Sequence, residues 1–205
     1  MSQSSPFPPG AVQWSGENPG MYLKESADGP FTSLASFYRV DTSPHGSGVG
    51  VVLLEAPGTP ASSPEALNVC VSDNEALSRY LVEHYISTFG SFKGQPGLQG
   101  LEYRALTAHS TQNDMPKSYT EHLGAEGVAI SLTWAGLGDP FMVDMPAEQG
   151  PTGIYRMFSL FVDCNDARAT INGRALKGRS FPRDFAGRQS TTAFLAFSET
   201  WILPG

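Results

Sequence analysis

The stretch Ala193-Phe-Leu-Ala-Phe-Ser-Glu-Thr-Trp-Ile-Leu203 is an apolar run of strand length that holds a single carboxylate, Glu199. Side chains of a strand alternate between its two faces. Regular alternation therefore predicts one shared face for Leu195, Phe197, Glu199 and Trp201. Because burying an unpaired charge is costly, we expect Glu199 either to face a cavity or to have a buried partner.

Similar short apolar runs make up most of the chain, and they are separated by turns that use many of its 22 glycines and 16 prolines. The strands predicted from these runs are Met21–Lys24, Leu34–Asp41, Val49–Leu54, Leu67–Val71, Leu101–His109, Ser118–Leu123, Val128–Ala135, Phe141–Met145, Tyr155–Cys164 and Thr191–Leu203. Asn172-Gly173 lies between two short apolar segments and predicts a hairpin, since both central residues of its turn take positive φ. Ser180–Arg188 is expected to be a loop anchored by two phenylalanines, with a lid over a ligand site as the alternative.

One segment has helical character. Ser72 and Glu75 have the Ser-x-x-Glu spacing of a capping box, and Gly90 follows a stretch without Gly or Pro. We predict one long helix over about residues 73–89, largely buried, with Arg79 and Glu83 spaced to pair. One helix among many strands, without a βαβ pattern, predicts a mainly β (α+β) fold, namely an antiparallel barrel or strongly curved sheet, calycin-like. A β-sandwich is the alternative.

Length and composition suit a single β-rich domain over residues 11–205, preceded by a flexible Ser- and Pro-rich tail over residues 1–10. The net charge of −7 argues against nucleic acid or an anionic membrane surface as a partner. No segment approaches the roughly 18 apolar residues of a membrane span, and the first residues lack a secretory signal pattern. Cys70 and Cys164 lie in apolar runs and are expected to be reduced core thiols, which favours a cytoplasmic location.

No familiar catalytic motif is present, and the histidines lack the spacing of a zinc motif, so we expect no metal and no cofactor. His109 and His122 flank a plausible hairpin and could share a ligand. Two separate imidazoles are the favoured interpretation. The apolar settings of both cysteines raise the thiol pKa and argue against a cysteine nucleophile.

General acid–base chemistry is the remaining catalytic option. An apolar wall would raise the pKa of Glu199 and suit it to proton transfer, with Tyr103 as its helper. The alternative for Glu199 is a structural ion pair or a solvent-facing position. Residues 156–188 carry seven basic and three acidic side chains, which could meet an anionic group or simply be solvated. The predicted ligand-binding residues are Trp201, Phe197, Arg104, Tyr119, Trp134, Tyr155, Arg156 and Arg183.

These observations favour a small-molecule binding protein, whose barrel holds a partly apolar ligand and whose C-terminal arginines meet any acidic group on it. The competing hypothesis is a cofactor-independent isomerase, cyclase, dehydratase or lyase that uses Glu199 as general acid or base in the same pocket. A homodimer formed through sheet edges is a third option with less support.

Overall fold

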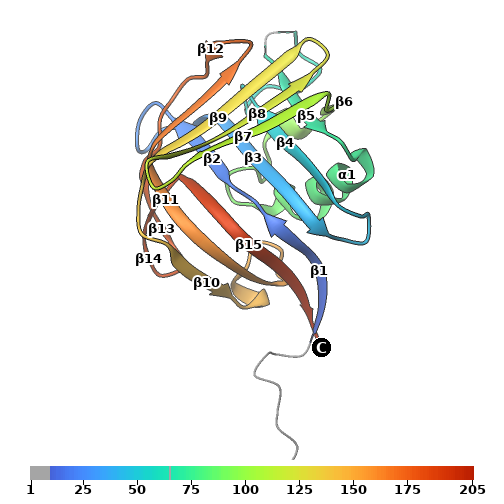
Figure 1. Ribbon diagram of the computed structural model, residues 1–205, viewed down its shortest axis with the longest axis vertical. Helices are drawn as coiled ribbons and strands as arrows, with labels where there is room; N and C mark the ends of the chain where they lie inside the picture. The colour runs from blue at the N-terminus through green and yellow to red at the C-terminus, as the bar shows by residue number, and fades with distance from the viewer. Residues whose placement is uncertain (1–9, 65) are drawn as a thin grey trace, which may run out of the picture.

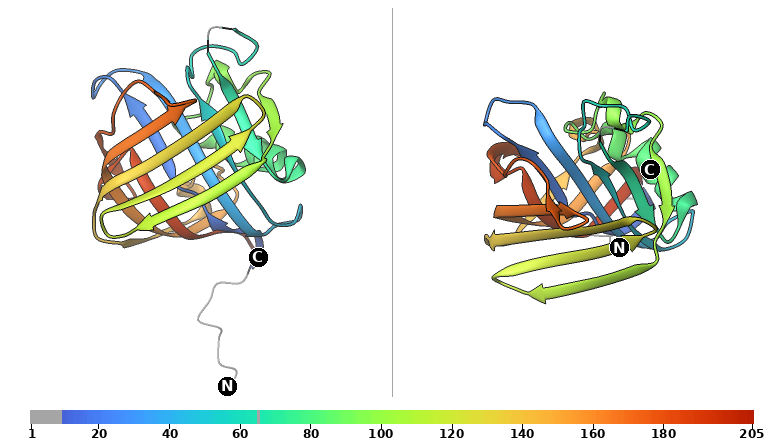
Figure 2. Two further views of the ribbon diagram at one scale, coloured as in Figure 1. Left: turned by 45° about the horizontal axis from the view of Figure 1, so that its top comes forward. Right: turned by 90° about the horizontal axis from the view of Figure 1, so that it is seen from above.

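The computed structural model describes residues 10–64 and 66–205, and these form a mainly β protein with one α-helix and a large, strongly curved sheet (Figures 1 and 2). The strands are β1 (Gly10–Glu17), β2 (Gly20–Lys24), β3 (Phe31–Thr42), β4 (Gly48–Leu54), β5 (Asn68–Ser72), β6 (Glu102–Ala105), β7 (Ala108–Asp114), β8 (Ser118–Ala125), β9 (Val128–Leu137), β10 (Phe141–Met145), β11 (Arg156–Ile171), β12 (Arg174–Ala175), β13 (Pro182–Phe185), β14 (Arg188–Thr191) and β15 (Ala193–Pro204). The helices are α1 (Glu75–His84) and the 3₁₀ turns η1 (Ile86–Thr88), η2 (Pro96–Leu98) and η3 (Ala147–Gln149).

The main path through the sheet runs β6-β5-β4-β3-β1-β15-β11-β9-β8-β7, with β10 and β12 on β11. Strand β2 pairs with both β15 and β3, so β1, β3, β2 and β15 close a ring of four strands. Strands β13 and β14 form a separate two-stranded sheet. Pairing between the named strands is antiparallel except for β5 and β6, which are parallel and joined through α1. The predicted antiparallel sheet is therefore wrong at this one pair.

Two apolar cores lie on opposite faces of the sheet. Alternate residues of β3 and β4 divide between them, with Phe37 and Val51 in the first core and Tyr38 and Val52 in the second. Residues of β8 and β9 cover the first core, because the sheet curls over this face. The helix α1 and the turn η1 contribute to the second core, which also contains the end of β15.

The helix is shorter than predicted and begins with a different cap. Asn74 is the N-cap, and its side chain accepts a hydrogen bond from the backbone N–H of Leu77. Ser72 lies two residues before this N-cap and instead accepts a hydrogen bond from the backbone N–H of Asn74. At Tyr85 the backbone leaves the helical region, where the ring packs against buried aromatics, and a 3₁₀ turn follows. Arg79 pairs with Glu75 at 2.7 Å rather than with Glu83.

Most strand predictions are confirmed, with a few exceptions. The predicted strand Leu101–His109 is divided into β6 and β7. Strand β11 is one long strand that extends to Ile171, where the hairpin turn begins. The Asn-Gly turn is confirmed, with φ of 50° at Asn172 and 77° at Gly173. Strand β1 was not predicted, and it includes Gly10 of the supposed tail, whose other residues lie outside the described part.

Both cysteines are buried free thiols, as expected from the sequence. Burial raises the pKa of the Cys70 thiol to about 11 and that of Cys164 to about 12. Across residues 10–64 and 66–205, no helix has the length and apolar character needed to cross a bilayer.

Candidate functional site

A β-bulge in β15 determines where Glu199 points. Phe197 pairs with Leu160 and Thr200 pairs with Phe158, so Ser198 and Glu199 together lie opposite the single residue Ser159. Ser198 has a φ of 51°, which is rare for a residue with a side chain. An extra residue in one strand interrupts the alternation of side chains between faces.

The bulge therefore divides the four residues predicted to share a face. Leu195 and Phe197 contact the first core, while Trp201 belongs to the second core. Glu199 follows Trp201 onto that face and reaches a cavity there. The prediction of a single shared face is wrong, because regular alternation ends at Ser198.

The cavity has a volume of about 370 Å³, which falls in the range of small-molecule sites. Strands from both ends of the chain and the segment after η1 enclose it. Its apolar lining is Tyr22, Phe31, Phe89, Met145, Pro151, Met157, Phe161, Phe185, Phe194 and Trp201. Asn18, Gly90, Ser91, Arg183 and Glu199 complete the wall. An apolar cavity with few polar groups is the usual form of a site that binds organic ligands.

Glu199 is the buried acid of this wall, with 4% of its surface exposed. The indole N–H of Trp201 donates to its Oε1 at 2.7 Å. Burial raises the pKa of Glu199 to about 8, although the hydrogen bond from Trp201 opposes this rise. No cation within residues 10–64 and 66–205 forms an ion pair with it. At neutral pH the carboxyl is therefore mostly protonated, and it can both accept and donate a hydrogen bond.

Arg183, on β13, is the cation of the same wall, and its side chain is half-buried. Its guanidinium carbon lies 4.5 Å from the ring centroid of Phe185 and 4.8 Å from that of Phe194. Its Nε and Nη2 atoms are buried and have no hydrogen-bond partner among the described residues. Burial lowers the pKa of Arg183, because a charged group loses its hydration there. The stacked rings supply cation–π attraction, but they do not supply a counter-charge.

Asn18 and Tyr22 lie at the same wall. The Asn18 side chain accepts a hydrogen bond from the hydroxyl of Ser36 at 3.0 Å through Oδ1, and its Nδ2 is buried without a partner in the part of the chain described. Burial raises the pKa of Tyr22 well above its usual range, so this phenol stays neutral. The cavity thus contains a protonatable carboxyl, a cation and a buried amide donor.

Of the predicted site residues, the structure brings Glu199, Trp201 and Arg183 together at this cavity. Tyr103 lies on β6 under the guanidinium of Arg79, at a smaller pocket beside Cys70, and is not part of the cavity lining. Arg104 binds Glu102 and the carbonyl of Glu126. Arg156 forms an ion pair with Asp144.

The four predicted aromatic residues away from the cavity have other contacts. Tyr119 donates to Glu121, and Phe197 packs edge-to-face on Tyr119. Trp134 is buried in the first core and donates to the carbonyl of Gly20. Tyr155 stacks on Tyr85, which in turn contacts Trp201. Their predicted role in binding a ligand stays a prediction.

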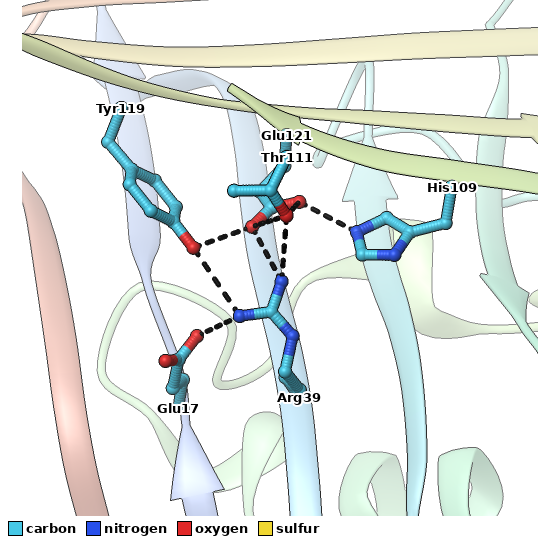
Figure 3. Close-up of polar contacts among 6 residues, drawn as sticks. All are labelled: Glu17, Arg39, His109, Thr111, Tyr119 and Glu121. Atoms are coloured by element: carbon cyan, nitrogen blue, oxygen red, sulfur yellow. Dashed lines mark hydrogen bonds and ion pairs between the residues drawn. The ribbon is translucent and has the colours of Figure 1, made fainter. Parts of the chain in front are cut away.

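A second polar cluster joins β3 to β7 and β8, and Figure 3 shows its side chains converging on Glu121. The fully buried carboxylate of Glu121 accepts hydrogen bonds from Tyr119 at 2.8 Å, from Arg39 at 2.9 Å and from Thr111. His109 Nε2 lies 2.7 Å from the second oxygen of Glu121, and Arg39 also binds Glu17. Because the buried carboxylate is fully paired, this cluster has the character of a structural network.

This network also separates the two histidines considered as a shared ligand. His109 is opposite Leu123 and turns toward the buried Glu121, whereas His122 is opposite Ser110 and exposed. Successive residues of a strand face opposite sides, so the two imidazoles point away from each other. No group of three or more potential metal ligands occurs among the residues the structure describes.

Sequence reasoning missed Asn18, Tyr22 and Phe194 as wall residues. Asn18 occurs in a Gly-Glu-Asn-Pro-Gly segment that has the composition of an ordinary turn. Its burial depends on β3, since Ser36 binds its side chain. The segment around Phe181 and Phe185 was predicted to be an anchored loop, with a lid over a ligand site as the alternative. The structure makes this segment the hairpin β13–β14 instead of a loop.

Comparisons with known proteins give no relative for this chain: no family model, no curated protein and no solved structure matches it.

Proposed function

We propose that this protein binds a partly apolar small molecule in the cavity beside Glu199, including ligands that carry an acidic group. The observation that supports this most is a mostly apolar cavity of about 370 Å³ whose wall holds a buried carboxyl and a half-buried guanidinium that are not paired with each other. Unpaired buried polar groups are costly for a folded protein, and a ligand that pairs them would offset this cost.

The curved sheet with its ring of four strands supports the further proposal of a calycin-like, barrel-type binding scaffold. In such a scaffold the ligand is enclosed by strands and by the segments that cross the open end. Here the hairpin β13–β14 would be such a segment, since Arg183 and Phe185 extend from it to the cavity.

The same cavity supports a second candidate, a cofactor-independent isomerase, cyclase, dehydratase or lyase. A carboxyl with a pKa of about 8 can transfer a proton near neutral pH. In this proposal Glu199 would be the general acid or base, and Arg183 would polarise the substrate. The partners and location proposed with either function are those expected from the sequence: a small molecule, no nucleic acid or membrane, a possible homodimer and a cytoplasmic setting.

Native mass spectrometry of the freshly purified protein, compared with its denatured mass, tests the binding proposal directly. We expect a reproducible non-covalent adduct, whose mass would identify the ligand. Titration with the neutral fluorophore Nile red provides a second readout, with fluorescence rising as the dye enters an apolar site.

A pair of glycine variants links the Nile red signal to this cavity. Gly90 lies at its exposed rim, and a Cβ added there or at Gly58 meets no atom within 4 Å. We expect Gly90→Phe to weaken Nile red binding and Gly58→Phe, away from the cavity, to leave it unchanged. Absence of both the adduct and Nile red binding in the wild-type protein would reject the proposal. For the enzymatic alternative, Glu199→Gln should abolish turnover in a substrate screen while Nile red still binds.

A further inference from the structure

Arg183 has the geometry of a carboxylate receptor. Of its three nitrogens, Nε and Nη2 are the two that are buried without a partner among the described residues. These two nitrogens lie on the same edge of the planar guanidinium, and two parallel N–H groups on one edge match the two oxygens of a carboxylate. The unpaired part of Arg183 is thus a complete bidentate donor.

The charge of the cavity wall favours a monoanion. Among the lining residues the titratable groups are Tyr22, Arg183 and Glu199, of which only Arg183 is cationic. One carboxylate balances one guanidinium, whereas a phosphate dianion would leave an uncompensated charge in an apolar cavity.

The rings of Phe185 and Phe194 pack against this guanidinium. Arg183 can adjust to a ligand with little rearrangement of the main sheet, because β13 pairs with β14 alone. The base of this hairpin is fixed where Asp163 accepts hydrogen bonds from Ser190 and Thr191.

Glu199 supplies a second and different point of recognition. The indole N–H of Trp201 occupies Oε1, and no ion pair with a described residue holds the carboxyl in its charged form. Burial favours the neutral acid, whose hydroxyl is a donor. A neutral acid at the wall matches an uncharged acceptor on the ligand, such as a ketone, ether or epoxide oxygen.

We infer that the ligand is an apolar carboxylic acid with a second, uncharged oxygen acceptor, its carboxylate bound by Arg183 and its acceptor by Glu199. This inference rests on the proposed function and specifies the chemical class of the ligand. It applies equally to a bound ligand and to a substrate.

Three ten-carbon probes test the inference: decanoate, decanol and an oxo-decanoate with its ketone near the far end of the chain. Each is titrated against Nile red bound to the full-length protein at about pH 6, where the carboxylate is ionised and Glu199 is protonated. We expect decanoate to bind about 10-fold or more tightly than decanol, as for a hydrogen-bonded charge pair. The oxo-decanoate should bind several-fold more tightly than decanoate.

Matched variants assign each effect to its residue. Arg183→Met should bring decanoate and decanol to within about 2-fold of each other. Arg188→Met is the control on the same hairpin, since Arg188 packs on Phe141 outside the cavity lining, and it should retain the full preference. Glu199→Gln keeps a hydrogen-bond donor and should retain the advantage of the ketone, whereas Glu199→Met should lose it.

The outcomes separate this inference from the proposed function. Equal binding of decanoate and decanol to a protein that binds Nile red would overturn the inference and leave the cavity as a binding site. A carboxylate preference that survives Arg183→Met would also overturn it. If neither Nile red nor any probe binds, the proposed function fails and the inference fails with it.

Discussion

The substitution Glu199→Gln should remove a large pH dependence from the stability of this protein. The folded-state pKa is about 8, compared with 4.5 for an ordinary glutamate. Between these values the folded protein holds a proton that the unfolded chain has lost, so the free energy of unfolding falls as pH rises. The loss begins near pH 4.5 and levels off above pH 8, where Glu199 is ionised in both states.

The size of this effect follows from the same two values. Each pH unit within the window costs about 1.4 kcal/mol, so the whole window is worth on the order of 5 kcal/mol. Glutamine has nearly the same shape, cannot ionise, and still accepts the Trp201 hydrogen bond through its amide oxygen. We therefore expect Glu199→Gln to match the wild-type protein to within about 1 kcal/mol near pH 5 and to exceed it by several kcal/mol near pH 9.

Urea unfolding followed by tryptophan fluorescence at a series of pH values measures this difference, because all three tryptophans are buried. The other titratable groups contribute to both proteins, so subtracting the two curves isolates Glu199. Tyr22, the other neutral titratable group of the cavity wall, has a raised pKa and stays uncharged through the window. The exposed Glu83→Gln variant is the control and should parallel the wild-type curve. A difference curve for Glu199→Gln that is flat from pH 5 to pH 9 would refute the account of Glu199 as a buried, unpaired acid.

Three further predictions concern Trp201, Glu121 and Ser198. Trp201→Phe removes the hydrogen bond that favours ionised Glu199. The upper end of the pH range over which the free energy of unfolding falls should therefore move to higher pH, and an unchanged range in urea unfolding would contradict this. Glu121→Leu should destabilise the protein by about 3 kcal/mol or more at neutral pH in urea unfolding, because Arg39 and Tyr119 lose a buried partner. A loss under 1 kcal/mol would show that the network in Figure 3 contributes little to the free energy of unfolding. Ser198→Gly should raise stability by about 0.5–1 kcal/mol, since glycine adopts the positive φ of the bulge without strain, and Ser198→Val should lower it in the same assay.

The strand pattern could be predicted because it depends on the local sequence. Runs such as Val49–Leu54 and the Asn172-Gly173 turn carry their signal within a few residues, and the structure places a strand and a hairpin there. Strand β1 was missed because its apolar residues are spaced among polar ones, and the bulge between Val12 and Trp14 disturbs the period further. The helix cap differed because Asn74 and Ser72 both have capping side chains, and the sequence does not rank them.

The candidate site could be predicted only in part, for a physical reason that Glu199 illustrates. A carboxylate in an apolar run predicts a cavity or a buried partner beside it, and this signal is local. Which face it occupies depends on the bulge opposite Ser159, and that bulge depends on the pairing of β15 with β11. Asn18 and Tyr22 meet Glu199 only because β2 closes the ring with β15. Such long-range pairings leave no signal in a single sequence.

The separation of Arg183 from Glu199 is the strongest support for the proposed ligand-binding function of the cavity. Glu199 is buried and Arg183 is half-buried at one wall, and direct pairing would offset much of the cost of removing them from water. The fold instead places Arg183 among aromatic rings and leaves Glu199 with an indole N–H as its polar contact. A protein selected for stability alone would pair these groups or replace them with apolar residues. Keeping them apart across an apolar space is costly unless a third molecule, with one group for each of them, occupies that space.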